Sequence, residues 1–407
     1  MTRRIVVVGA GQAGMLLALG LQRHGYEMTV IAERTAEELR TGRVISNQCI
    51  FERALQHERS QGLNFWDEKA PPVNGIAFGA GQPGVPEPVI RWESPLEQPA
   101  QSVDQRLKMS DWLTEFARRG GEIRHDRVEP DGLAALAREF DLVLVAAGRG
   151  PQFGRLFARR PELSPFTGPQ RAIALMYLTP NQPEFYQGVT FALAPDGEWF
   201  SLPVLSVTGP VYGVYFSGYL GGPLDCWDDI RDVEHFFEVA TKAVDRHFPW
   251  LAPILRNTAP NGPLDYLKGK VTPVVRDPVG TLDFGAKVLA MGDTAVTNDP
   301  IAGQGANMAA HCAAAYQQTI LDQGDRPFDE EFMRRAFDRF WQTAKHAVRF
   351  SNDLLSPPPP HVLATFQAAQ ENPVVAHRFA ALFNDNSDYT AWLTDEKVAM
   401  AYLASLA

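Results

Sequence analysis

The chain has 407 residues, and its 48 acidic residues outnumber its 38 Lys and Arg, which gives a formal net charge of −10. Its 45% hydrophobic and 21% charged content is typical of a globular protein and excludes a disordered chain. Because the chain is acidic and has no run of five or more Lys or Arg residues, we expect no nucleic-acid partner. The three cysteines lie far apart, in neither disulfide nor zinc-site spacing, so we expect no metal site and a cytoplasmic location.

The start of the chain predicts a strand, a helix and a second strand. Apolar residues run over 5–8, recur at helical spacing over 12–23 and run again over 28–32. The apolar start imitates a secretory signal, but glycines interrupt it and the second strand follows directly, so we expect no leader. No other segment approaches the roughly 18 apolar residues of a membrane span, and we expect no membrane association.

A glycine motif joins the first strand to the helix. The segment Gly9-Ala-Gly-Gln-Ala-Gly14 fits the pattern GxGxxG, in which glycines let the backbone approach a pyrophosphate at a helix N-terminus. Glu33 follows about 20 residues later, where an acidic side chain accepts a hydrogen bond from a ribose hydroxyl, which favours FAD or NAD over NADP. A tight structural turn is the alternative. The expected cofactor contacts are Gly9, Gly11, Gln12, Ala13, Gly14 and Glu33.

The middle of the chain first continues this α/β pattern and then leaves it. Residues 52–99 suggest a short helix followed by hairpins, and residues 104–119 a second helix. An apolar run over 142–147, after Asp141, indicates a buried parallel strand that ends at Gly148. Residues 171–218 alternate apolar and polar side chains between turns, which predicts an antiparallel sheet.

The last part returns to α/β character and ends in helices. We expect helices over 228–247 and 305–321, with a strand over 288–291 between them. The remaining residues predict helices that are interrupted by the polyproline joint Pro357–Pro360.

A second glycine-rich element follows the strand at 288–291. Asp293 is placed to bond a ribityl hydroxyl, and the helix after the glycine loop presents its N-terminus to the flavin O2 and N1 region. This element favours FAD over NAD, and the alternative is that the loop is only structural. The expected flavin contacts here are Asp293, Pro300, Gly303, Gly305, Ala306 and Asn307.

Two arginines are further candidates for the cofactor site. Arg106 lies early on the helix over 104–119, where it could reach the flavin or the pyrophosphate, or form a surface salt bridge. Arg43 follows Gly42 in a loop and is placed to meet a phosphate or the flavin ring.

These motifs together resemble the two-component styrene and indole monooxygenases, relatives of the aromatic hydroxylases of the para-hydroxybenzoate type. The resemblance spans the whole chain, and its most specific part is the block over 292–308. The other segments on which the resemblance rests are the first glycine motif, Glu33-Arg34, Gly42-Arg43, Val103-Asp-Gln-Arg-Leu107 and Pro169-Gln-Arg171. Arg34 and Gly148 join the expected FAD contacts on this basis.

The resemblance implies an α/β protein with a Rossmann-like FAD-binding fold of the para-hydroxybenzoate hydroxylase type, an inserted antiparallel β-sheet substrate domain and a helical C-terminal portion. The FAD-binding domain would comprise 1–65, 100–168 and 271–325. The substrate domain would comprise 66–99 and 169–270, followed by the helical region 326–407.

It also implies an activity. A separate NADH-dependent flavin reductase would supply reduced FAD, which reacts with O2 to a C4a-hydroperoxide that epoxidises a small aromatic substrate. Such enzymes are homodimers, and sulfide oxidation is expected as well.

A few pocket positions divide the family into styrene and indole branches. All of those positions except Ile50 hold the residues of the indole branch, and Ile50 replaces methionine conservatively. The positions are Ser46, Gln48, Ile50, Val73, Ile76 and Ala100. Gln48 would accept the indole N–H while the apolar walls take the benzo ring, although these residues could instead be plain core beside the flavin.

We therefore expect epoxidation of the C2=C3 bond of indole, leading to indoxyl and indigo. The alternatives are a styrene monooxygenase, a single-component NAD(P)H-dependent aromatic hydroxylase, and a flavin-binding carrier that has lost oxygenation.

Overall fold

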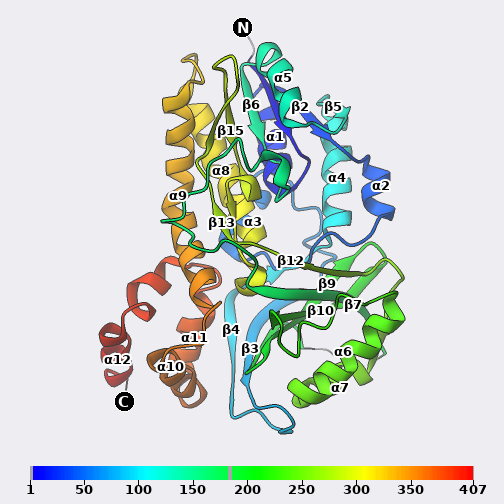
Figure 1. Ribbon diagram of the computed structural model, residues 1–407, viewed down its shortest axis with the longest axis vertical. Helices are drawn as coiled ribbons and strands as arrows, with labels where there is room; N and C mark the ends of the chain where they lie inside the picture. The colour runs from blue at the N-terminus through cyan, green and yellow to red at the C-terminus, as the bar shows by residue number, and fades with distance from the viewer. Residues whose placement is uncertain (1–2, 182–185, 407) are drawn as a thin grey trace.

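The computed structural model describes residues 3–181 and 186–406, which form two lobes, each built on its own sheet (Figure 1). The sheet of the first lobe has six strands in the order β14-β15-β6-β1-β2-β5, parallel except for β14. Its central strands are continuous apolar runs because both faces are covered. The bounds are β1 Arg4–Val8, β2 Glu27–Ala32, β5 Glu122–His125, β6 Leu142–Val145, β14 Val279–Thr281 and β15 Lys287–Ala290.

Helices pack on this sheet and on one another. The expected helices after the first glycine motif, around residue 110 and after the glycine loop over 299–304, which we call the flavin loop, are all confirmed. The longest, α9, begins where Asp329 accepts a hydrogen bond from the Phe332 N–H, and it packs along α8. The bounds are α1 Gln12–Gln22, α2 Ala36–Thr41, α3 Glu52–Arg59, α4 Gln105–Arg118, α5 Leu133–Glu139, α8 Gly305–Gln323 and α9 Glu330–Asp353.

The second lobe holds an eight-stranded sheet in the order β11-β7-β10-β9-β8-β3-β4, with β12 also paired to β7. The antiparallel sheet expected over residues 171–218 is confirmed in the pairing of β7, β8, β9 and β10, whereas β3 pairs with β8 in parallel, with Ile76 opposite Val189. The bounds are β3 Pro72–Ala80, β4 Ile90–Gln101, β7 Arg171–Pro180, β8 Val189–Ala194, β9 Gly197–Ser206, β10 Gly209–Tyr219, β11 Thr258–Pro260 and β12 Tyr266–Lys270. The domain boundary expected at residue 100 falls inside β4.

The second sheet is covered on both faces (Figure 1). Side chains alternate along β7: Met176 packs with helix α6, while Leu175 and Tyr177 join the core shared with the C-terminal helices. The bounds of the covering helices are α6 Val233–His247, α7 Ala252–Arg256, α10 Pro360–Glu371, α11 Pro373–Ala381 and α12 Glu396–Ala404.

The remaining short elements connect these layers. The polyproline joint is confirmed, since α9 ends at Asp353 and α10 starts at Pro360. A two-stranded ribbon, β13 Val274–Val275 with β16 Val296–Thr297, precedes the glycine loop. Over residues 3–181 and 186–406, none of the helices combines the length and the apolar character that a membrane crossing requires.

Candidate flavin and substrate site

The glycines of the first motif have two different roles. A Cβ built on Gly9, at φ +112°, would lie 2.3 Å from the Ala146 carbonyl oxygen, and one on Gly14 would lie 2.5 Å from the Gly9 carbonyl oxygen. These two glycines are therefore required by contacts inside the protein. A Cβ on Gly11 would meet no described atom within 4 Å. Gly11 thus borders open space at the carboxyl ends of the parallel strands, where a dinucleotide lies in such folds.

Two helix N-termini open at this edge of the sheet. Among the described side chains, none caps α1 or α8, and neither helix carries an acidic residue in its first turn. Their first N–H groups and their positive dipole ends therefore suit an anionic ligand. The side chain of Gln12 connects the two helices, because its Nε2 donates to the Ala306 carbonyl oxygen at 3.3 Å. Ala13 lies beside Gly292, whose built Cβ would contact it at 3.0 Å.

The glycine loop before α8 is open on the same side. Gly303 has φ +63°, and a Cβ built on Gly303 or Gly305 would meet no described atom within 4 Å. Gly148 has φ +76° and faces similar space. Its carbonyl oxygen accepts a hydrogen bond from Thr294 Oγ1 at 3.2 Å, which joins the end of β6 to the turn after β15. Backbone with this much free space fits a flavin that approaches closely.

Charged side chains border this open edge. Asp293 lies 3.6 Å from Arg149 and remains partly exposed, so it can accept from a ribityl hydroxyl. Pro300 follows Asp299, whose pKa is raised to about 6 by burial. Glu33 and Arg34 are exposed at the end of β2, where the ribose is expected.

Asn307 holds two segments together. Its Nδ2 donates to the carbonyl oxygens of Cys49 and Gly303 at 2.9 and 3.0 Å, and its Oδ1 accepts from the Phe51 N–H at 2.9 Å. Its amide is thus engaged by the protein itself, and it connects the flavin loop to the segment that carries the expected substrate residues.

The two arginines lie in different surroundings. Arg106 is buried and bonds Asp104 and Asp265 as well as the Gly42 carbonyl oxygen, so its charge is neutralised inside the protein rather than in a surface salt bridge. Arg43 is exposed and lies over the Tyr266 ring, 4.4 Å from its centre.

The fold brings three apolar pocket positions together. Val73 pairs directly with Ala100 across β3 and β4, so the two side chains share a face. A register shift after Val73 lets Ile76 join the same buried cluster although it is three residues away. Ile50 does not join them. It pairs with Gln101 and packs into the core of the first lobe.

Gln48 is the polar member of the expected pocket. It is buried, its Nε2 donates to the Val103 carbonyl oxygen at 2.8 Å, and its Oε1 accepts from Gln105 Nε2. One Oε1 lone pair and one Nε2 hydrogen remain for another partner. Ser46 is half-buried two residues earlier in the same loop.

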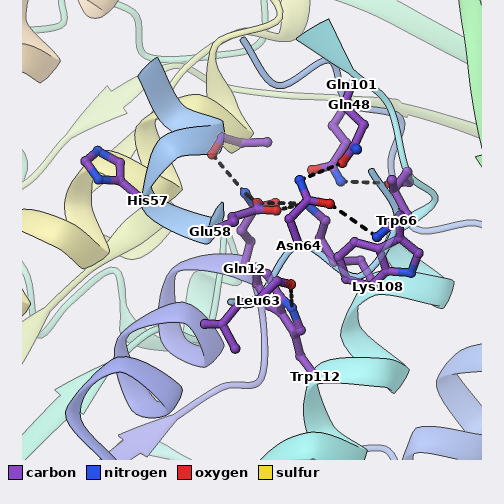
Figure 2. A network of polar contacts seen from close by, with 12 residues as sticks. Gln12, Gln48, His57, Glu58, Leu63, Asn64, Trp66, Gln101, Lys108 and Trp112 are labelled. Atoms are coloured by element: carbon purple, nitrogen blue, oxygen red, sulfur yellow. Dashed lines mark hydrogen bonds and ion pairs between the residues drawn. The ribbon is translucent and has the colours of Figure 1, made fainter. Parts of the chain in front are cut away.

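The sequence analysis missed a buried polar network behind Gln48 (Figure 2). Lys108 Nζ lies 2.7 and 2.9 Å from the two carboxylate oxygens of Glu58, and solvent barely reaches either side chain. Burial raises the pKa of Glu58 and lowers that of Lys108, while their contact opposes both shifts. The signal in the sequence was the spacing of Gln105, Lys108 and Trp112, which places polar and aromatic side chains on one face of α4.

Comparisons with known proteins show which families the chain is similar to. The family model described as "Styrene monooxygenase A putative substrate binding domain" matches residues 148–253. Styrene monooxygenase StyA of Pseudomonas fluorescens is 31% identical over 398 residues, covering 94% of this chain and 93% of that protein. StyA of a Pseudomonas species is 31% identical over 396 residues, with the same coverage.

Solved structures share the fold at low sequence identity. The flavin-dependent brominase Bmp2 has a TM-score of 0.68 at 14% sequence identity. The match covers 94% of this chain and 93% of the brominase chain. For 2-methyl-3-hydroxypyridine-5-carboxylic acid oxygenase the TM-score is 0.63 at 16% sequence identity. That match covers 92% of this chain and 95% of the oxygenase chain.

The relatives at 31% identity define an FAD-dependent monooxygenase, and the solved structures show that its fold is of the para-hydroxybenzoate hydroxylase type. The chain belongs to the styrene monooxygenase family.

Proposed function

We propose that the chain epoxidises the C2=C3 bond of indole, using O2 and reduced FAD that a separate NADH-dependent flavin reductase supplies. The observation that carries the choice of indole is the amide of Gln48, which is buried, anchored and still able to make one more hydrogen bond. A site that holds a buried hydrogen-bonding group favours a ligand that satisfies it. The apolar side chains of Val73, Ile76 and Ala100 suit a benzo ring.

FAD supplies the oxygen activation, and the residues of the chain position the reactants. The proposed FAD contacts are those of the two glycine motifs, except Asn307, whose amide is engaged by the protein, together with Gly148, Glu33, Arg34 and Arg43. The uncapped N-terminus of α8 stabilises negative charge on the flavin, and the buried walls exclude water. The oxygen is transferred to an electron-rich double bond, so the reaction requires no general base from the chain.

Styrene epoxidation is the second candidate function, because the named relatives are styrene monooxygenases. The same electrophilic oxygen would also attack sulfides. The proposal further includes the cytoplasmic location and a homodimer, as expected from the sequence.

The test is a competition between substrates. The purified chain is mixed with chemically reduced FAD, O2 and equal concentrations of indole and styrene, and both oxygenated products are quantified. An excess of oxygenated indole supports the proposal. An excess of styrene oxide would replace indole with styrene as the substrate, and the flavin assignment would stand.

A further inference from the structure

Glu58 and Lys108 form a charged pair that solvent does not reach, and their position is connected to the expected pocket. Lys108 donates to both Glu58 oxygens and lies 5.3 and 5.2 Å from the ring centres of Trp66 and Trp112. In Figure 2 the pair lies beside Gln12, with the two tryptophans flanking the lysine. Because both oxygens receive hydrogen bonds from the ammonium, Glu58 offers only acceptors to its other neighbour.

That neighbour is the first of three glutamines that bond in series: Gln12, Gln105 and Gln48. We call these three side chains the glutamine relay. Gln12 Nε2 donates to Glu58 Oε1 at 3.3 Å, so its carbonyl oxygen must point the other way, and there it accepts from Gln105 Nε2 at 3.0 Å. The second hydrogen of Gln105 Nε2 is donated to Gln48 Oε1. Each amide therefore has the orientation that the preceding one requires.

The hydrogen bonds at both ends of the relay require the same orientation of the three amides. At the far end, Gln48 Nε2 donates to the Val103 carbonyl oxygen, which accepts only. At the near end, the second hydrogen of Gln12 Nε2 is donated to Ala306 O. A single flipped amide would place two acceptors or two donors against each other in a buried site and leave these groups without hydrogen-bond partners.

We infer that Glu58 at one end of the glutamine relay and the carbonyl oxygens of Ala306 and Val103 together hold its direction, and that the relay thereby fixes which atoms of the Gln48 amide face the substrate. Glu58, Lys108, Gln105 and Gln12 are positioning residues in this account, and Gln48 is the specificity-determining residue. The inference rests on the proposed function, because it assigns the N–H of indole to the amide of Gln48.

The experiment compares equilibrium binding of indole with that of indene, which has the same shape but no N–H. Binding is measured calorimetrically with the chain loaded with oxidised FAD. The variant Gln105→Met interrupts the relay at similar volume. The double variant Glu58→Gln with Lys108→Met removes the carboxylate at one end of the relay, whose oxygens can only accept, and leaves no unpaired charge. Replacing a buried ion pair by neutral groups is often tolerated.

The matched control is Gln323→Met. Gln323 is also buried and hydrogen-bonded, but it ends α8, roughly 27 Å along the helix from the flavin loop at 1.5 Å per residue.

We expect the ratio of indole affinity to indene affinity to fall about 5- to 10-fold in Gln105→Met and in the double variant, the loss of about one hydrogen bond. Indene affinity should stay within about twofold, and the control should keep the wild-type ratio. A ratio that is unchanged in both relay variants would overturn the inference. If the wild-type chain converts styrene but not indole, the proposed function fails instead, which the product competition shows independently.

Discussion

Oδ1 of Asn307 accepts a hydrogen bond of 2.9 Å from the backbone N–H of Phe51. The same side chain donates to the Cys49 carbonyl oxygen, so one amide satisfies two buried backbone groups that lie more than 250 residues earlier in the chain. The flavin loop and the segment of the substrate residues therefore cannot move independently.

Replacing this amide should loosen that joint. In Asn307→Ala the Phe51 N–H and the Cys49 carbonyl oxygen lose their partner, which should cost about 1–3 kcal/mol of stability. Thermal unfolding followed by circular dichroism measures this loss as a lower midpoint. An Asn307→Ala variant with the wild-type midpoint but weaker FAD binding would show that Asn307 instead contacts the flavin.

Adding one methyl group to the glycine loop tests where FAD lies. A Cβ on Gly305 meets no described atom, so Gly305→Ala should keep the stability of the chain. The methyl group would occupy space assigned to the flavin, and FAD affinity should fall at least about tenfold, as expected for overpacking. Titration with FAD measures this.

The matched control is Gly269→Ala in β12. It also meets no described atom, and it is exposed in the second sheet. It should bind FAD as the wild type does, and equal affinities for both variants would contradict the placement of the flavin.

We expect Arg106 to stabilise the folded chain rather than to bind the cofactor. In Arg106→Met, Asp104 and Asp265 would be left buried without their cation, which should cost about 3–5 kcal/mol. Arg118→Met is the control, because that arginine is 71% exposed and its ion pair contributes little. Urea unfolding compares the two. Unchanged stability together with weaker FAD binding in Arg106→Met would return Arg106 to the cofactor site.

Two histidines predict how stability depends on pH. His57 Nε2 lies 3.0 Å from His311 Nδ1, and burial lowers both pKa values, that of His311 to about 3. Below about pH 6.5 the unfolded chain binds protons that the folded chain excludes, so this stability is present above pH 6.5 and is lost as the pH falls. The loss should be on the order of 1 kcal/mol per pH unit for His311.

Urea unfolding between pH 7.5 and 5 measures this loss. The variant His311→Gln should show a smaller loss of stability toward acid than the wild type. The same acid dependence in both proteins would rule out this pair as its source.

The sequence predicted the parts of the site whose chemistry is local. The first glycine motif, the loop before α8 and the helix at 305–323 each depend on neighbours in the chain, and glycine positions mark them directly. The polyproline joint was predictable for the same reason, since proline cannot continue a helix.

Other features depend on contacts between distant segments. The parallel pairing of β3 with β8 joins strands that are more than 100 residues apart, and alternation of side chains does not reveal the direction of a partner. The register shift after Val73 changes which side chains share a face. Glu58 and Lys108 are of a type that is usually exposed, and only the meeting of α3 and α4 shows that they are buried.

We propose that this chain uses flavin that is reduced elsewhere. The most direct measurement is a single-turnover reaction in which the purified chain receives chemically reduced FAD, O2 and indole, with neither NADH nor a reductase present. We expect oxygenated indole in proportion to the reduced FAD added, and no NADH consumption by the chain with oxidised FAD. Product that forms only when NADH is added to the chain and oxidised FAD would contradict it.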